Sequence, residues 1–193
     1  KTTTAINLAT ALAAINKKVL ILDSDPQGNA STGLGILEKD GEPSLYGLLT
    51  NQQFEQESIK PTIIPNLDII TSTQDLAASE IELATMEKRE NIIKNILSQI
   101  HGYDFVLIDC PPALGLLTIN GLVASNSVLV PLQCEFFALE GLSALINTIE
   151  AIRSSLNPDI VLEGVVLTMF DKRNSLSSLV EKDVRSHFGK KVY

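Results

Sequence analysis

The residues best suited to chemistry are a lysine and a threonine at a helix start and acids that follow two apolar runs. Lys1 and Thr2 open a predicted helix. Asp23 and Asp25 follow one run of four apolar residues, and Asp109 follows another. A lysine at a helix N-terminus suits phosphate groups, because free backbone N–H groups there already favour anions. Hydroxyl and carboxylate oxygens are ligands for Mg²⁺. These residues therefore predict a Mg-nucleotide site.

A sheet must hold these acids in place. Continuous apolar runs such as 19–22 are typical of strands that are covered on both faces. We predict helices at 2–16, 44–49, 75–85, 88–100, 115–125, 139–156 and 176–188, and strands at 19–22, 67–71, 104–109, 127–131 and 161–168. Strands and helices alternate with short links, which predicts an α/β fold with a mostly parallel twisted sheet and helices on both faces.

Three segments carry weaker signals. Residues 24–35 read as a polar loop with several glycines, and residues 38–65 read as surface elaboration without chemistry. We expect Gly102 to close the helix predicted at 88–100, since glycine is common just after a helix C-terminus. We expect residues 190–193 to begin the next connection.

The composition is that of one globular domain with an aliphatic core. The chain has 193 residues, of which 45% are hydrophobic and 5% aromatic, and it has no Trp. The net charge of -8 argues against a nucleic-acid footprint over the whole chain, although it leaves room for a local basic patch. Cys110 and Cys134 are too few and too far apart for a disulfide or metal framework, so we expect both to be reduced. No apolar run is long enough to span a membrane.

Each site residue has a plainer interpretation when taken alone. A loop carboxylate is often a turn or helix-cap residue, and Lys-Thr is a common pair. Asp109 also fits an acid that acts on Mg²⁺ through water. The Pro111-Pro112 pair and Gly115 then suggest a stiff turn and a hinge, as in a loop that senses a γ-phosphate. An ordinary strand-to-helix connection remains open for this segment.

Taken together, the motifs closely resemble the ParA/Soj family of chromosome and plasmid partition ATPases, which have a deviant phosphate loop. The resemblance covers nearly the whole chain. It rests on residues 1–9 (KTTTAINLA), 23–31 (DSDPQGNAS), 108–112 (IDCPP), 114–120 (LGLLTIN), 133–142 (QCEFFALEGL) and 167–171 (LTMFD). It implies a P-loop NTPase with a three-layer, Rossmann-like fold that binds and hydrolyses Mg-ATP.

The resemblance implies a role for each nucleotide-site residue. Lys1 would be the phosphate-loop lysine, and Thr3 would lie near the α-phosphate. Asp25, in the first switch loop, would position the attacking water. Asp109 would be the strand-end acid, so that Thr2, Asp25 and Asp109 surround Mg²⁺.

Further roles follow from the same resemblance. Asp23 would support the metal shell, and Pro112 would contact the nucleotide from the second switch loop (110–115). The family's signature lysine would precede Lys1, and its adenine-contacting segment would follow Tyr193. We therefore expect residues 1–193 to be a single, incomplete P-loop ATPase domain that binds ATP poorly by itself.

The resemblance also implies partners. Family members form ATP-dependent homodimers that bind DNA without sequence specificity, and a ParB-type centromere-binding protein stimulates hydrolysis. The DNA-binding candidates here are basic residues near the end of the chain: Lys172, Arg173, Lys182, Arg185, Lys190 and Lys191. Their alternative interpretation is a solvated helix face. The implied location is cytoplasmic and nucleoid-associated, without a membrane partner.

Three other functions remain to be weighed. A membrane-positioning ATPase resembling MinD would need a C-terminal amphipathic helix, and its first switch loop does not usually read Asp-Pro-Gln-Gly. An iron–sulfur carrier ATPase would need bridging cysteines at a dimer interface. A non-catalytic nucleotide-binding adaptor is disfavoured by the presence of both Asp25 and Asp109.

Overall fold

The first apolar run forms strand β1 (Val19–Asp23), which lies inside a four-stranded sheet of order β2-β3-β1-β4. Its neighbours are β3 (Leu67–Ile70) and β4 (Phe105–Asp109), and both pair with β1 in parallel. The outer strand β2 (Ile59–Pro61) pairs with β3 in the antiparallel direction. The predicted mostly parallel sheet is therefore confirmed.

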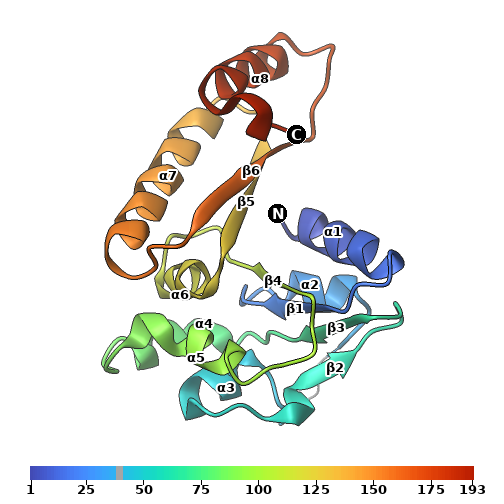
Figure 1. Cartoon of the computed structure of the whole chain (residues 1–193), viewed down its shortest axis with the longest axis vertical. Coiled ribbons are helices and arrows are strands. Elements are labelled where there is room, and N and C mark those ends of the chain that lie inside the picture. Colours follow the sequence, from blue (N-terminus) through green and yellow to red (C-terminus); the bar gives the residue numbers. More distant parts are fainter. Residues whose placement is uncertain (38–40) are drawn as a thin grey trace. The chain divides into compact units, whose positions relative to one another are not determined.

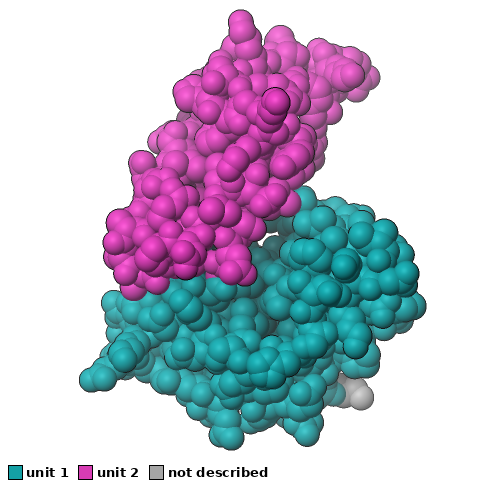
Figure 2. All heavy atoms as spheres, in the orientation of Figure 1, with its two compact units in different colours: residues 1–124 teal, residues 125–193 magenta. Residues whose placement is uncertain are grey.

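The structure is a computed structural model, which describes residues 1–37 and 41–193. The chain divides into two compact units, Lys1–Ala124 and Ser125–Tyr193 (Figure 2). The segment predicted as surface elaboration includes residues 38–40, which lie outside the described ranges. The prediction of a single domain over 1–193 stays a prediction.

Helices cover both faces of the sheet in the first unit (Figure 1). Successive side chains of β1 point to opposite faces, so they belong to two different cores. Val19 and Ile21 pack toward α1 (Thr2–Ala14) and α2 (Asn29–Gly33). Leu20 and Leu22 pack toward the opposite layer of helices. That layer consists of α3 (Leu45–Asn51), α4 (Leu76–Leu83), α5 (Ile92–Leu97) and α6 (Leu116–Ala124). All four apolar side chains of β1 are fully buried, as the continuous run predicts.

Several predicted boundaries are wrong in informative ways. The first helix ends at Ala14, and Asn16 turns the chain with a left-handed φ of 61°. The helix predicted at 88–100 is a 3₁₀ turn, η2 (Arg89–Asn91), followed by the short α5. Because α5 ends at Leu97, Gly102 does not cap it and instead lies in the loop before β4.

Two elements escaped prediction. Helix α2 lies within the segment expected to be a polar loop, where polar residues and glycines hide the helical period. Strand β2 is preceded by the 3₁₀ turn η1 (Gln56–Ser58) and has only three residues, too few to show a period. Both are held by tertiary hydrogen bonds rather than by local sequence preference.

The second unit is a two-stranded parallel sheet with two helices. Strands β5 (Ser127–Gln133) and β6 (Val161–Thr168) pair in parallel, with a register shift between Val128 and Leu129. Helices α7 (Ala138–Ser155) and α8 (Ser175–Phe188) contribute Leu142, Val180 and Val184 to the core that covers these strands. After the 3₁₀ turn η3 (Gly189–Lys191), Val192 pairs with Val165 of β6. The chain end therefore adds to this sheet, whereas we expected a connection there.

Candidate functional site

The candidate site lies at the carboxyl ends of β1 and β4 in the first unit. Asp23 and Asp109 are paired residues of the two strands, and Ser24 N donates to Asp109 O at 2.9 Å. Asp23, Asp25 and Asp109 are 0%, 8% and 4% exposed. Parallel pairing in register is what gathers acids from positions more than eighty residues apart. Ligands of open α/β sheets bind at this edge.

Asp23 is held by the helix that follows its own loop. Its Oδ2 accepts hydrogen bonds from Ser31 N at 2.9 Å and from Ser31 Oγ at 2.7 Å, and its Oδ1 accepts from Asp25 N at 3.4 Å. Burial raises the pKa of Asp23 above its usual value, and the bonds from Ser31 partly offset this rise. Ser31 Oγ also accepts from Ser72 N at 3.2 Å, which links the loop to the end of β3.

Asp25 lies in a tight turn. Its Oδ1 accepts from Gln27 N at 3.0 Å, and its carbonyl oxygen accepts from Gly28 N at 2.9 Å. Gly28 has a left-handed φ of 59°, and a Cβ at this position would lie 3.1 Å from Ser72 O. Glycine is required there both for the turn and for its close approach to the neighbouring loop.

Asp109 has a buried carboxylate oxygen without a hydrogen-bond partner among the described residues. Burial raises the pKa of Asp109, a hydrogen bond from the Thr2 hydroxyl and the charge of Lys1 lower it, and the charge of Asp25 raises it. Asp109 Oδ2 and Ser24 Oγ are buried without a hydrogen-bond partner among the described residues. A buried oxygen of this kind needs a partner. Hard oxygen donors suit Mg²⁺, which takes few protein ligands and keeps several waters. The residues therefore fit the predicted metal.

The start of α1 faces the same region. Lys1 is the N-cap residue, its side chain makes no capping bond, and no acidic residue occupies the first turn of the helix. The electrostatic influence of Lys1 reaches both Asp109 and Cys110. The structure thus brings together Lys1, Thr2 and the three acids. Thr3 and Pro112 are exposed, and their contacts with nucleotide remain predictions.

The cysteines have the environment of structural thiols. Burial raises the pKa of Cys110 to about 12. The pKa of Cys134 is also raised, by burial first and then by the charge of Glu181. The two thiols are free and belong to different units.

The DNA-binding candidates lie in the second unit. Arg173 binds Asp171 through two side-chain hydrogen bonds, of 3.1 and 2.9 Å. Arg185 Nε contacts Glu181 at 2.9 Å, and its Nη1 donates to a main-chain oxygen. Lys172 and Lys190 are exposed. The charges of the two arginines are therefore partly balanced within the unit.

Four polar residues near the site were missed by the sequence analysis: Ser31, Ser72, Glu80 and Asn120. Ser31 and Asn120 fall inside the family motifs, which was the one available signal. Ser72 and Glu80 carry no signal, since their partners are distant in sequence.

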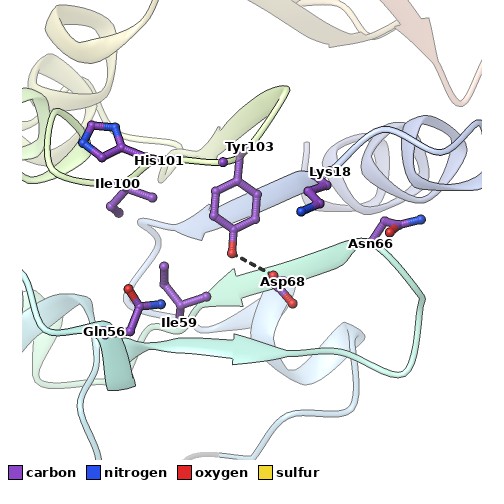
Figure 3. A pocket seen from close by; sticks show the side chains of 9 residues that line it. Lys18, Gln56, Ile59, Asn66, Asp68, Ile100, His101 and Tyr103 are labelled. Carbon is purple, nitrogen blue, oxygen red and sulfur yellow. Dashed lines mark hydrogen bonds between the residues drawn. The ribbon is translucent and has the colours of Figure 1, made fainter.

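A cavity of about 320 Å³ lies at the amino ends of the same strands (Figure 3). The Tyr103 hydroxyl points into it and donates to Asp68 Oδ2 at 2.7 Å. Lys18 and His101 also line this space. The cavity is at the edge of the sheet away from Asp23 and Asp109, so it is separate from the candidate site.

None of the helices in residues 1–37 and 41–193 is both long and apolar enough to cross a membrane.

The sequence of the chain is similar to those of known proteins. A family model described as an AAA domain matches residues 1–162. The chain is 53% identical to the chromosome partitioning protein ParA of Caulobacter vibrioides, over 100% of this chain and 73% of that protein. It is 49% identical to the sporulation initiation inhibitor protein Soj of Bacillus subtilis, over 100% of this chain and 77% of that protein.

Solved structures agree on the fold. A cobyrinic acid a,c-diamide synthase from Mycobacterium smegmatis, with bound ATP analog and magnesium, has a TM-score of 0.89 and 35% identity, over 97% of this chain and 77% of that one. A plasmid partition protein from Borrelia burgdorferi has a TM-score of 0.83 at 23% identity, over 98% and 80% of the two chains, and supports the fold alone. By its sequence relatives, its domain match and its three-layer α/β fold, the chain belongs to the ParA/Soj family of partitioning ATPases.

Proposed function

We propose that this ATPase is the nucleotide-driven switch of a DNA-partition system. One observation carries the proposal within the family: buried Asp23, Asp25 and Asp109 converge beside the start of α1, where Thr2 reaches Asp109. A buried oxygen of Asp109 has no protein partner in the described structure, as expected for a group whose partner arrives with the nucleotide.

Each side chain has a proposed task. Lys1 contacts the β- and γ-phosphates as a point charge, and the main chain near Thr3 contacts the α-phosphate. Asp25 orients the attacking water, and the bond from Gln27 N holds its carboxylate within the turn. Asp23 keeps that turn in place through Asp25 N. Pro112 restricts the second switch loop beside the nucleotide.

Thr2, Asp25 and Asp109 are the proposed residues around Mg²⁺, with Asp109 acting through a water. When bound, the ion neutralises charge on the phosphate oxygens. Hydrolysis is expected to be slow, because the lifetime of the ATP state governs a switch.

The ATP state is proposed to be a homodimer that binds DNA without sequence specificity. Lys172, Arg173, Arg185 and Lys190 are the proposed phosphate contacts, and such contacts need no base readout. A ParB-type protein is the proposed activator of hydrolysis. The proposed location is the cytoplasm, on the nucleoid. The names of the relatives support a partition function.

Asp25→Ala tests the proposal in the full-length protein. Loss of an oriented water should slow ATP turnover by about a hundredfold or more, while ATP binding remains. In a DNA pull-down with ATP, the variant should stay on DNA longer than the parent. Asp75→Ala removes an exposed carboxylate of the same unit and should leave both measurements unchanged.

Two outcomes would overturn parts of the proposal. Turnover at the parental rate in Asp25→Ala would remove Asp25 from its assigned role. A parental protein that hydrolyses ATP but binds anionic vesicles instead of DNA would favour the membrane-positioning alternative.

A further inference from the structure

The second switch loop (110–115) leads into α6, whose first turn is hydrogen-bonded to a helix that is distant in sequence. The main-chain N–H of Leu117, in the first turn of α6, donates to Glu80 Oε1 at 3.3 Å. Glu80 belongs to α4, 37 residues earlier in the chain. A carboxylate near a helix N-terminus also meets the positive end of the helix dipole. One side chain of α4 therefore sets where α6 begins.

Gly115 lies against the Glu80 carboxylate, and its lack of a side chain allows this close approach. A Cβ at Gly115 would overlap Glu80 Oε1 and would lie 3.1 Å from Glu80 Cδ. Gly115 is not among the glycines of positive φ, so its lack of a side chain leaves room for the Glu80 carboxylate, which a Cβ would displace. We expected a hinge here. The hinge stays a prediction, and the structure places the Glu80 carboxylate directly against the Gly115 backbone.

Neighbouring hydrogen bonds hold the segment around the contact between Glu80 and Gly115 in place. Thr118 Oγ1 donates to Ala113 O at 2.6 Å, which closes the loop onto the first turn of α6. Asn120 is fully buried: its Oδ1 accepts from Ile93 N at 3.2 Å, and its Nδ2 donates to Arg89 O at 2.8 Å. The end of the loop that lies away from Asp109 thus has its position determined by α4, η2 and α5.

We propose that Glu80 is a positioning residue for ATP hydrolysis. It holds the second switch loop in place by packing against Gly115 and by accepting a hydrogen bond from Leu117 N in the first turn of α6. It acts through the loop and does not touch the nucleotide. The inference rests on the proposed role of residues 110–115 as a switch loop. If so, α4 helps to position the candidate site, although no residue of α4 belongs to that site.

A double-mutant cycle in the full-length protein tests the inference. Glu80→Ala removes both acceptor and bulk, whereas Glu80→Gln keeps an oxygen that can accept from Leu117. Gly115→Ala introduces the overlap, and the double variant Glu80→Ala/Gly115→Ala relieves it. Glu82→Ala is the matched control, because Glu82 lies on the same helix and its carboxylate accepts only from the Tyr46 hydroxyl among the described residues.

The expected pattern separates positioning from general damage. Glu80→Ala should lower kcat about tenfold, equivalent to ~1.4 kcal/mol, and leave KM for ATP within about twofold. Glu80→Gln should recover most of this loss. Gly115→Ala should cost about as much as Glu80→Ala in the parent, and almost nothing further in the Glu80→Ala background.

Hydrogen exchange at the Leu117 amide gives a readout that does not depend on activity. It should accelerate in Glu80→Ala and stay near the parental rate in Glu80→Gln and Glu82→Ala. An unchanged Leu117 exchange rate in Glu80→Ala would overturn the inference, as would equal costs of Gly115→Ala in both backgrounds. If the parent fails to bind DNA with ATP, the partition proposal fails, while the exchange and kcat comparisons still decide the role of Glu80.

Discussion

The hydroxyl of Ser31 donates to Asp23 Oδ2 at 2.7 Å and accepts from Ser72 N at 3.2 Å. One side chain therefore joins a buried carboxylate at the end of β1 to the loop that follows β3. Both partners are buried, so neither bond can be replaced easily by bulk water. The segment that follows β1 is thus tied to two neighbouring strands.

Ser31→Ala should destabilise the protein by about 1–3 kcal/mol, because it removes a donor from buried Asp23 and leaves Ser72 N unsatisfied. Urea unfolding measures this change. Ser79→Ala is the control, since Ser79 is also buried but, within the described part of the chain, its hydroxyl donates only to Leu76 O of its own helix. Equal losses in the two variants would show that the link through Ser31 adds nothing beyond an ordinary buried hydroxyl.

Asn120→Asp should be more damaging than Asn120→Ala at neutral pH. The substitution replaces the Nδ2 donor with an oxygen that faces the carbonyl oxygens of Arg89 and Leu116. Placing a buried charge against two acceptors should cost about 3 kcal/mol or more, whereas the alanine variant loses the bonds but adds no charge. Thermal unfolding of both variants tests the order. A smaller loss in the aspartate variant would mean that Asn120 is not held as described.

The destabilisation caused by Tyr103→Phe should be largest at neutral pH and should shrink as the pH rises above 10.0. Burial first, and then the bond to Asp68, raise the pKa of Tyr103 above its ordinary value of 10.0. A tyrosine that resists ionisation in the folded state contributes stability fully below pH 10.0, and this contribution is lost as the pH rises further. Urea midpoints measured across this range should fall more steeply for the parent than for Tyr103→Phe. Parallel curves would contradict the assignment.

Arg173→Glu should weaken DNA binding and leave ATP affinity unchanged, if Arg173 contacts phosphate. Because Asp171 already pairs with Arg173, Asp171→Asn should strengthen binding by freeing the guanidinium. Filter binding over a salt series measures both effects. Lys94→Glu, the same charge change on an exposed residue of α5, controls for net charge. Unchanged DNA retention in Arg173→Glu at low salt would remove this residue from the interface.

Local pattern was enough for much of the fold. The apolar runs of β1 and β4 predicted strands. Burial on both faces explains the lack of alternation in β1, where Leu20 and Ile21 lie in opposite cores. It does not explain edge strand β4, whose Phe105 and Val106 are 42% and 38% exposed. Prediction failed where tertiary bonds override local preference. Helix α2 consists mostly of polar residues and ends in a glycine, and it forms where Ser31 N donates a hydrogen bond to Asp23 Oδ2.

The sequence by itself determined the family, the α/β class and the identity of the acids at two strand ends, because these depend on local order along the chain. Only the tertiary structure decided that Asp23 and Asp109 lie side by side in register and that Asp109 keeps an oxygen without a partner among the described residues. It alone decided that Glu80 occupies the space left by Gly115. Such contacts join residues that are distant in sequence, and no local pattern encodes which distant side chain will fill a given space.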